Sequence, residues 1–423
     1  MARRADCGVG KWITALAAAL TTIGVEMIDT TADFISSLDD PTAAPQVEIL
    51  VNKKTGRARQ AGASQDEGEL VELFRSKCEG SLYSFCKGIL GLTRLTKNLH
   101  REVCRRAQKI PPYRKLFLLP RDHLKTSIFS RGMPIHMLIQ PKERNVYRPS
   151  QEGSSTRILL SNETSTNAEH FLRWIEGRYE ACELLRALWP HRVWEDPRKE
   201  SKKWNEKEMT VPRIDDYPEA SIETIGVGGA ITSRHYDVLI KDDLVSIEAA
   251  NSPLVMYDAI EWHKTSRALM DSPDTSLEFI VGTRWAALDI YQYIINEDPS
   301  VEPYVRSAFE DGEPIFPEIF NANALNQIQR EMGPVMFSLL YMNSAVNPEL
   351  VDFSPDDLRY YTVSGENIIV EEDERDVMIR ADINRKKFDA TAVANDVRGM
   401  PFNSKTYDLI VGGRAEYFRA KAK

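Results

Sequence analysis

The feature that most constrains the fold of this sequence is the alternation of short apolar runs with helical segments over residues 116–281. Runs of strand length occur at residues 116–119, 158–160, 238–240 and 277–281, and segments with helical periodicity separate most of them. A chain that alternates strands with helices forms a mostly parallel sheet, because each helix carries the chain back across one face of the sheet. We therefore predict an α/β fold with a mostly parallel sheet flanked by helices.

The pattern also suggests four segments along the 423 residues. We expect residues 1–68 to form a helical and flexible N-terminal region, since residues 52–67 are rich in Lys, Gly, Gln, Ala and Ser. Residues 69–346 would hold the α/β domain, and residues 347–373 would form a linker. In residues 374–423 strands follow one another with no helix between them, which indicates the start of a different domain.

The composition narrows the classes of function. A net charge of −9 produces no overall positive field, so contacts with DNA would need local basic patches. The five cysteines are scattered and lack a C-x-x-C pair, which argues against a disulfide framework or a zinc site and fits a reducing cytoplasm. The apolar stretch at residues 12–25 is short for a membrane span and lacks a small-residue cleavage site, so we favour a helix there.

The first apolar run leads into a candidate phosphate-binding loop at residues 120–126. The run ends at a proline, and a turn then delivers Lys125 and Thr126 to an expected helix start. Backbone N–H groups at a helix N-terminus bind phosphate, a lysine reaches the β- and γ-phosphates, and the hydroxyl holds Mg²⁺. Leu119 and Leu124 occupy the two positions that are usually glycine. An ordinary strand–turn–helix with a solvated lysine is therefore the alternative.

Two other strand ends carry residues suited to the same chemistry. Residues 238–240 lead to Asp242, a candidate Mg²⁺ ligand, and Asp243, a candidate general base, although such pairs commonly only cap a turn. The run at 277–281 ends in Gly282, Thr283 and Arg284, which could sense a γ-phosphate or simply end a strand. Upstream, a helical pattern places four basic residues on one face that could meet phosphates or be solvated: Arg94, Lys97, Arg101 and Arg105.

In their order and spacing these motifs resemble the large terminase subunit of tailed bacteriophages, an ATPase–nuclease motor that packages DNA. The resemblance runs from about Leu82 to Tyr407. It includes the glycine-poor loop with an early arginine, residues 232–243, residues 282–285 with Asp289 and Tyr291, and the segment at 333–341. In this family the missing glycines of the loop are a normal variation. The implied fold is a P-loop NTPase-type sheet.

The resemblance implies ATP and Mg²⁺ as cofactors and assigns roles to individual residues. The implied nucleotide-binding residues are Pro120, Arg121, Asp122, His123, Leu124, Lys125, Thr126 and Asp242. Of these, Thr126 and Asp242 would hold Mg²⁺, and Arg121 would act as an arginine finger in cis. Asp243 would be the base, and Thr283 would couple hydrolysis to movement. Many family members have glutamate at the position of Asp243, and an aspartate reaches one methylene less far toward the attacking water.

The family's C-terminal domain is a ribonuclease-H-like nuclease that uses two Mg²⁺ or Mn²⁺ ions. Asp382 matches its first metal ligand, and Asp389 matches a structural or auxiliary acid. Two-metal catalysis needs carboxylates from several strands. The strand and helix that would supply the remaining acids do not occur before Lys423. We therefore expect a C-terminally truncated nuclease that cuts DNA poorly or not at all.

The function implied by the resemblance is an ATP-hydrolysing motor subunit that packages double-stranded viral DNA into a capsid. Its implied partners are double-stranded DNA, a small terminase subunit and the capsid portal, on which it would form a homo-oligomer. The implied location is the cytoplasm of the bacterial host, with no membrane association. Two alternatives stay open: a helicase-like P-loop ATPase, and a non-catalytic prophage remnant that binds DNA or a partner.

Overall fold

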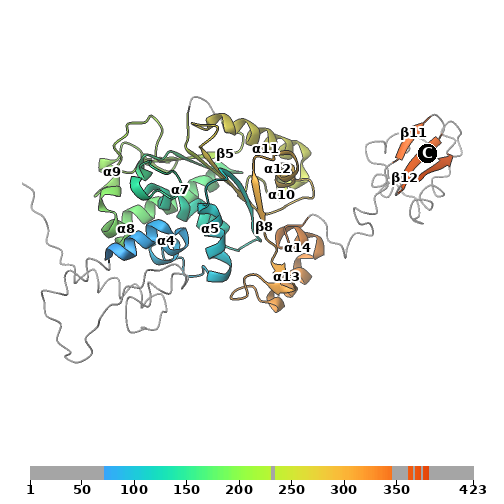
Figure 1. The fold of residues 1–423 in the computed structure, drawn as a ribbon, viewed down its shortest axis with the longest axis horizontal. Coiled ribbons are helices and arrows are strands. Elements are labelled where there is room, and N and C mark those ends of the chain that lie inside the picture. Colours follow the sequence, from blue (N-terminus) through green and yellow to red (C-terminus); the bar gives the residue numbers. More distant parts are fainter. Residues whose placement is uncertain (1–70, 230–233, 345–360, 365–366, 373–374, 381–423) are drawn as a thin grey trace, which may run out of the picture. The chain divides into compact units, whose positions relative to one another are not determined.

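The computed structural model describes residues 71–229 and 234–344, together with the backbone of residues 361–364, 367–372 and 375–380 (Figure 1). The chain divides into two compact units, Met1–Ala345 and Val346–Lys423. The first unit contains a large sheet with helices, and the second contains a small antiparallel sheet. None of the described helices has the length and apolar character needed to cross a membrane.

The first unit is built on an eight-stranded sheet with the strand order β3-β4-β5-β2-β6-β7-β1-β8. Its strands are β1 (Arg114–Leu118), β2 (Ile158–Asn162), β3 (Trp204–Asn205), β4 (Glu208–Met209), β5 (Ile222–Gly226), β6 (Val238–Asp242), β7 (Leu277–Gly282) and β8 (Glu302–Val305). Neighbouring strands from β5 to β8 in this order pair in parallel, whereas β3 and β4 form an antiparallel hairpin beside β5. The predicted mostly parallel sheet is therefore confirmed.

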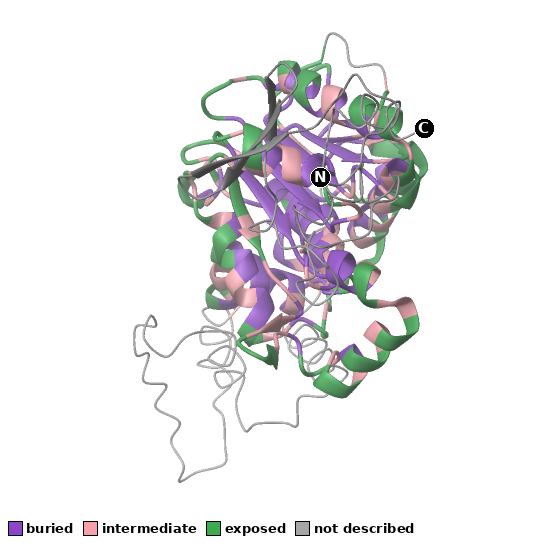
Figure 2. Ribbon diagram, turned by 90° about the vertical axis from the view of Figure 1, so that its right-hand side faces the viewer, coloured by how far each residue is buried: buried purple, intermediate pink, exposed green. Residues whose placement is uncertain are grey.

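Helices cover both faces of this sheet. The α-helices with both ends among the described residues are α4 (Leu82–Gly88), α5 (Glu102–Gln108), α6 (Met133–Leu138), α7 (Ser165–Ala181), α8 (Glu183–Leu188), α9 (Pro197–Glu200), α10 (Ile247–Asn251), α11 (Pro253–Thr265), α12 (Ile290–Glu297), α13 (Ala322–Met332) and α14 (Pro334–Leu340), and residues 71–80 are also helical. Two π-helical stretches, η1 (Lys97–Arg101) and η2 (Ser127–Gly132), run into α5 and α6. Figure 2 shows the strands buried and the outward sides of many helices exposed.

The two layers of helices follow from the alternation of side chains along each strand. In β1, Phe117 packs in the core formed with helices α4 to α7. Leu116 and Leu118, on the other face, pack in a second core with residues of α11 and α12. Because both faces are covered, the strand reads in the sequence as a continuous apolar run instead of an alternating one.

Helix α7 shows how the local sequence forms these elements. Thr164 caps its N-terminus, where the side-chain oxygen accepts a hydrogen bond from the N–H of Asn167 at 3.3 Å. The buried side chains recur every three or four residues and lie at Ala168, Leu172, Ile175 and Tyr179. This spacing gives the helix one apolar face, which packs on β2 and β5.

The parallel register brings three strand ends to one edge of the sheet. β7 lies between β1 and β6, with Leu118 opposite Gly282 and Asp242 opposite Val281. The chain leaves all three strands at the same edge, because they run in the same direction. The 120–126 loop, Asp243 and Thr283 therefore start from neighbouring positions.

The second unit contains an antiparallel sheet with the order β11-β12-β13. Its strands are β11 (Tyr361–Ser364), β12 (Asn367–Glu372) and β13 (Arg375–Arg380). β11 and β12 lie inside residues 347–373, so the segment that we interpreted as a linker is partly strand. Ile368, Ile369 and Val370 favour an extended backbone there. The proposed nuclease residues Asp382 and Asp389 and the N-terminal region 1–68 lie outside the described residues.

Candidate functional site

The 120–126 loop adopts a backbone that non-glycine residues rarely adopt. Asp122 has a φ of 62° and Leu124 a φ of 61°, both in the left-handed region. Leu124 occupies the second position that is usually glycine, so the turn keeps the left-handed geometry without the residue that adopts it most easily. A left-handed conformation costs an ordinary residue about 1–2 kcal/mol. Such strain persists only where surrounding contacts hold the backbone in place.

Contacts from distant segments supply that support. The N–H of Arg121 donates to the carbonyl oxygen of Leu340 in α14 at 2.9 Å. The buried ring of His123 donates from Nδ1 to the carbonyl oxygen of Arg121 at 2.8 Å and stacks on Phe320 with centroids 4.9 Å apart. Burial lowers the pKa of His123 to about 4, so the ring is neutral at pH 7. The loop is therefore fixed before any ligand binds.

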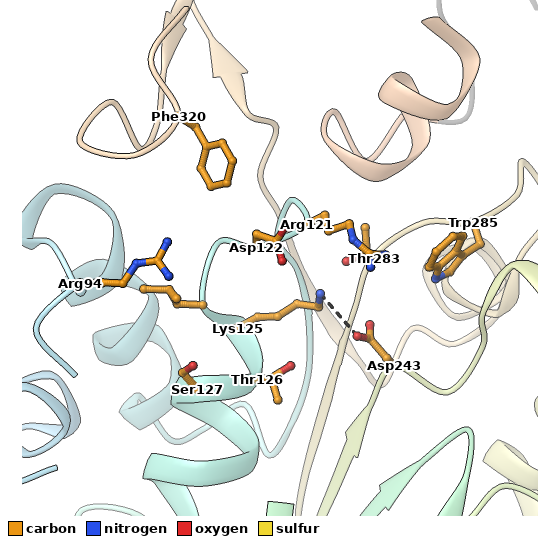
Figure 3. Close-up of a pocket in the computed structure, with 11 residues that line it drawn as sticks. Arg94, Arg121, Asp122, Lys125, Thr126, Ser127, Asp243, Thr283, Trp285 and Phe320 are labelled. Atoms are coloured by element: carbon orange, nitrogen blue, oxygen red, sulfur yellow. Dashed lines mark ion pairs between the residues drawn. The ribbon is translucent and has the colours of Figure 1, made fainter. Parts of the chain in front are cut away.

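The loop and the neighbouring strand ends enclose a pocket of about 510 Å³ (Figure 3). This volume lies within the range of small-molecule and cofactor sites. The lining residues are Arg94, Arg121, Asp122, Leu124, Lys125, Thr126, Ser127, Asp243, Thr283, Trp285 and Phe320. Polar and charged side chains predominate among them, as a site for a phosphorylated ligand requires.

Lys125 and Asp243 face each other across the pocket. Nζ of Lys125 lies 3.5 Å from Oδ2 of Asp243 (Figure 3). The lysine is 7% exposed, so its charge acts in a site with little solvent screening. Asp243 has a φ of 44°, and its N–H donates to the carbonyl oxygen of Val281 in the neighbouring strand at 2.9 Å. Oδ1 of Asp243 has no hydrogen-bond partner among the described residues.

Asp242, the last residue of β6, is buried, and only one of its two carboxylate oxygens has a hydrogen-bond partner among the described residues. Its Oδ2 accepts a hydrogen bond from Oγ of Ser130 at 2.6 Å, and its Oδ1 has no partner among the described residues. Burial and the neighbouring Asp243 raise the pKa of Asp242 to about 7. The charge of Lys125 and the nearby hydroxyl groups of Ser130 and Thr126 act in the opposite direction. A cation bound beside this carboxylate would compensate the buried negative charge.

These residues fit a Mg²⁺ ion that arrives with a nucleotide. No cluster of three or more His, Cys, Asp or Glu side chains that could hold a metal occurs in the described part of the chain. Mg²⁺ at phosphate-transfer sites typically takes one or two carboxylates and completes its shell with phosphate oxygens and water. The unsatisfied Oδ1 of Asp242 and the hydroxyl of Thr126, which lies near the same carboxylate, supply that partial set.

Arg121 and Arg284 are placed differently with respect to the pocket. The guanidinium of Arg121 lies over the ring of Trp285, 5.6 Å from its centroid, and Arg121 lines the pocket. Arg284, which could have sensed a phosphate or simply ended the strand, does not line the pocket. Its side chain is buried and donates to Asp289 at 3.1 Å and to Gln292 at 2.9 Å. Arg284 therefore holds the start of α12 in place.

Thr283 joins β7 to the 120–126 loop. The residue is buried and lines the pocket. Its hydroxyl donates to the carbonyl oxygen of Leu119 at 3.4 Å, a long hydrogen bond that links two neighbouring strand ends. A shift of either strand end would therefore change this hydrogen bond and act on the other strand end.

The structure brings together most of the residues singled out in the sequence. Arg121, Asp122, Leu124, Lys125, Thr126, Asp243 and Thr283 line one pocket, and Asp242 precedes Asp243 and is hydrogen-bonded to Ser130. Pro120 and His123 do not line the pocket, and both are buried. Sequence reasoning missed Ser130, although its spacing of four residues from Thr126 places both on one helix face. It also missed Trp285 and Phe320 as pocket residues.

Comparison with known proteins adds no assignment. No family model matches the sequence, and a search of curated proteins finds no significant match. Functional inference therefore rests on the geometry of the pocket and on the resemblance of the motifs around it.

Proposed function

We propose that this chain is a Mg²⁺-dependent ATPase and, from the resemblance of its motifs, a motor subunit of the large-terminase type that packages double-stranded DNA. One observation carries the ATPase proposal. Lys125, Thr126 and Asp243 reach one pocket from two different strand ends, beside a buried Asp242 carboxylate with an unsatisfied oxygen. An ordinary strand–turn–helix with a solvated lysine would not assemble these groups.

The geometry supports specific roles in phosphoryl transfer to water. Backbone N–H groups of the loop and the charge of Lys125 would bind the phosphate oxygens. A bound Mg²⁺, held by Thr126 and Asp242, would neutralise charge on the β- and γ-phosphates. Lys125 pairs with Asp243 in the ligand-free pocket. When a phosphate group pairs with Lys125 in place of Asp243, the Asp243 carboxylate becomes free to accept a proton from the attacking water.

Arg121 and Thr283 would act at the γ-phosphate end. Arg121 is exposed in the pocket and rests against Trp285 without an ion pair to another described residue. Its guanidinium could therefore turn toward the transferring phosphoryl group and stabilise its charge. Thr283 would transmit a change at the phosphate to β7, since its hydroxyl bonds to the strand end that carries the loop.

The test is the DNA-stimulated ATPase activity of the full chain. We expect Lys125→Ala to lower the turnover rate at least about 100-fold, because a preorganised charge beside the transferring phosphate is lost. Lys142→Ala removes an exposed lysine outside the pocket and should leave the rate unchanged. The ATPase proposal fails if the wild type does not hydrolyse ATP, or if Lys125→Ala hydrolyses it as fast as the wild type.

The packaging role needs its own measurement. Translocation of double-stranded DNA in the presence of a small terminase subunit and a capsid portal would support the motor. ATP-driven strand separation without such partners would instead favour the helicase-like alternative. DNA or partner binding with no ATPase activity would favour the non-catalytic remnant.

A further inference from the structure

We propose that Phe320 and Arg94 form the base-binding end of the pocket, where the aromatic base of a nucleoside triphosphate stacks. This inference rests on the proposed ATPase function and assigns residues that the motifs do not include. It starts from the size of the pocket, about 510 Å³. A triphosphate at Lys125, Thr126 and Asp243 leaves the base to be accommodated elsewhere in the same space.

The two residues lie away from the phosphate end. Figure 3 shows Arg94 and Phe320 on one side of Lys125, with Asp243 and Trp285 on the other. All five line the same pocket. A nucleotide with its γ-phosphate between Lys125 and Asp243 would therefore extend toward Arg94 and Phe320.

Phe320 is suited to serve as a stacking surface. Its ring is half-buried and stacks on His123 with an interplanar angle of 7°, and it contacts the rings of Phe316 and Tyr341 at 6.0 Å and 6.1 Å. These contacts fix the ring before the ligand arrives, so little side-chain entropy is lost on binding. Among the aromatic contacts of the described residues, only His123 stacks face to face on Phe320.

Arg94 lines the same end of the pocket and can complete the subsite. It is exposed and makes no hydrogen bond or ion pair to another described residue, so its guanidinium is not already engaged. A guanidinium stacks well on aromatic planes, including nucleobases. Trp285, the other aromatic residue in the pocket, is less suited, because it lies on the side of Asp243, at the phosphate end.

The experiment compares the binding of ATP and inorganic triphosphate to the full chain by calorimetry with Mg²⁺ present. Phe320→Leu keeps an apolar side chain but removes the aromatic face, and Arg94→Ala removes the guanidinium. We expect each variant to bind ATP about tenfold more weakly and to bind triphosphate as the wild type does. Phe320→Tyr keeps the ring and should bind ATP normally, as should Arg105→Ala, which changes an exposed arginine outside the pocket.

The outcomes separate this inference from the proposed function. If the wild type binds both ligands and neither variant weakens ATP, the base-binding role is wrong while the phosphate site stands. If a variant weakens ATP and triphosphate equally, its residue acts on the phosphates or on the loop, which also overturns the role. If the wild type binds neither ligand, the proposed function itself fails. Thermal unfolding of each variant shows whether its fold is intact.

Discussion

At the scale of single residues, the site depends on groups held in unfavourable states. Leu124 and Asp243 have left-handed backbones, and Asp242 is a buried carboxylate with one unsatisfied oxygen. Each state costs stability in the free protein, and bound phosphate and cation would relieve the electrostatic part of that cost. Strained backbones and perturbed carboxylates cluster at functional sites.

Glu176 shows the same kind of strain away from the pocket and gives a prediction on pH. It lies on the buried side of α7, and its Oε1 has no partner among the described residues. Burial, together with the charge of Glu180, raises its pKa to about 7. The folded state therefore holds a proton that the unfolded state releases, and this group lowers the free energy of unfolding as pH rises from about 4.5 to 7.

We expect Glu176→Gln to remove this penalty. Near pH 4.5 the variant and the wild type should be about equally stable, and at pH 8 the variant should be more stable by about 1 kcal/mol, since solvent screens part of the effect. Urea unfolding at both pH values measures the difference. Glu169→Gln, a change at a partly buried glutamate on the same helix, is the control. A Glu176→Gln advantage that does not change with pH would contradict the explanation.

At the scale of elements, β6 and β7 are held together by buried charge as well as by apolar packing. Nζ of Lys241 in β6 lies 2.5 Å from Oε1 of Glu278 in β7, and Arg267 donates to the other carboxylate oxygen at 2.9 Å. Burial alone would raise the pKa of Glu278, but these cations and His263 lower it to about 2. This network fixes the two strands whose ends carry Asp243 and Thr283.

Gly282, at the end of β7, sets the distance between this strand and α12. A Cβ atom at this position would overlap the ring of Tyr291, whose hydroxyl accepts a hydrogen bond from the N–H of Leu244 at 3.3 Å. We expect Gly282→Ala to destabilise the protein by about 1–3 kcal/mol, because the packed core must shift. It should also lower ATPase activity, since Tyr291 supports the backbone next to Asp243.

Urea unfolding and ATPase rates of the same preparation test this prediction. Gly177→Ala is the matched control, because its Cβ would point into open space within α7. This change should leave activity intact and stabilise the protein by up to about 1 kcal/mol, since alanine favours a helix interior over glycine. A Gly282→Ala variant as stable and active as the wild type would contradict the role of Tyr291.

At the scale of the whole molecule, the pocket joins segments that are distant in the chain. The 120–126 loop bonds to α14 through the contact of Arg121 with Leu340, and the N–H of Arg284 donates to Oδ1 of Asn343 at 3.3 Å. Residues 306–344 are thus attached to both the loop and the end of β7. A ligand in the pocket should stabilise all three segments together.

We therefore expect a non-hydrolysable ATP analogue with Mg²⁺ to raise the thermal unfolding midpoint by several degrees. At a ligand concentration 100 times the dissociation constant, linkage predicts about 2.7 kcal/mol of added stability. Differential scanning calorimetry with and without EDTA measures the part of the rise in the unfolding midpoint that depends on Mg²⁺. Asp242→Asn should lose that part. An equal shift in EDTA, or the same shift in Asp242→Asn, would show that Asp242 does not hold the ion.

The sequence predicted those parts of the molecule that depend on local patterns. The buried strands β1, β2, β6 and β7 read as apolar runs because helices cover both faces of the sheet. Their ends carry Lys125, Asp242, Asp243 and Thr283 close to strand termini, where function is most often found. The strands β3, β4 and β8 were missed, since the first two are two residues long and β8 contains proline and glutamate.

Local pattern alone therefore determined the α/β class and the residues at the carboxyl edge of the sheet. Only the tertiary structure decided that β7 lies between β1 and β6, that Arg284 turns away from the pocket, and that Phe320 and Arg94 line it. The physical reason is that strand order and pocket walls arise from packing between segments up to about two hundred residues apart. No periodicity within one segment records which distant segment will lie against it.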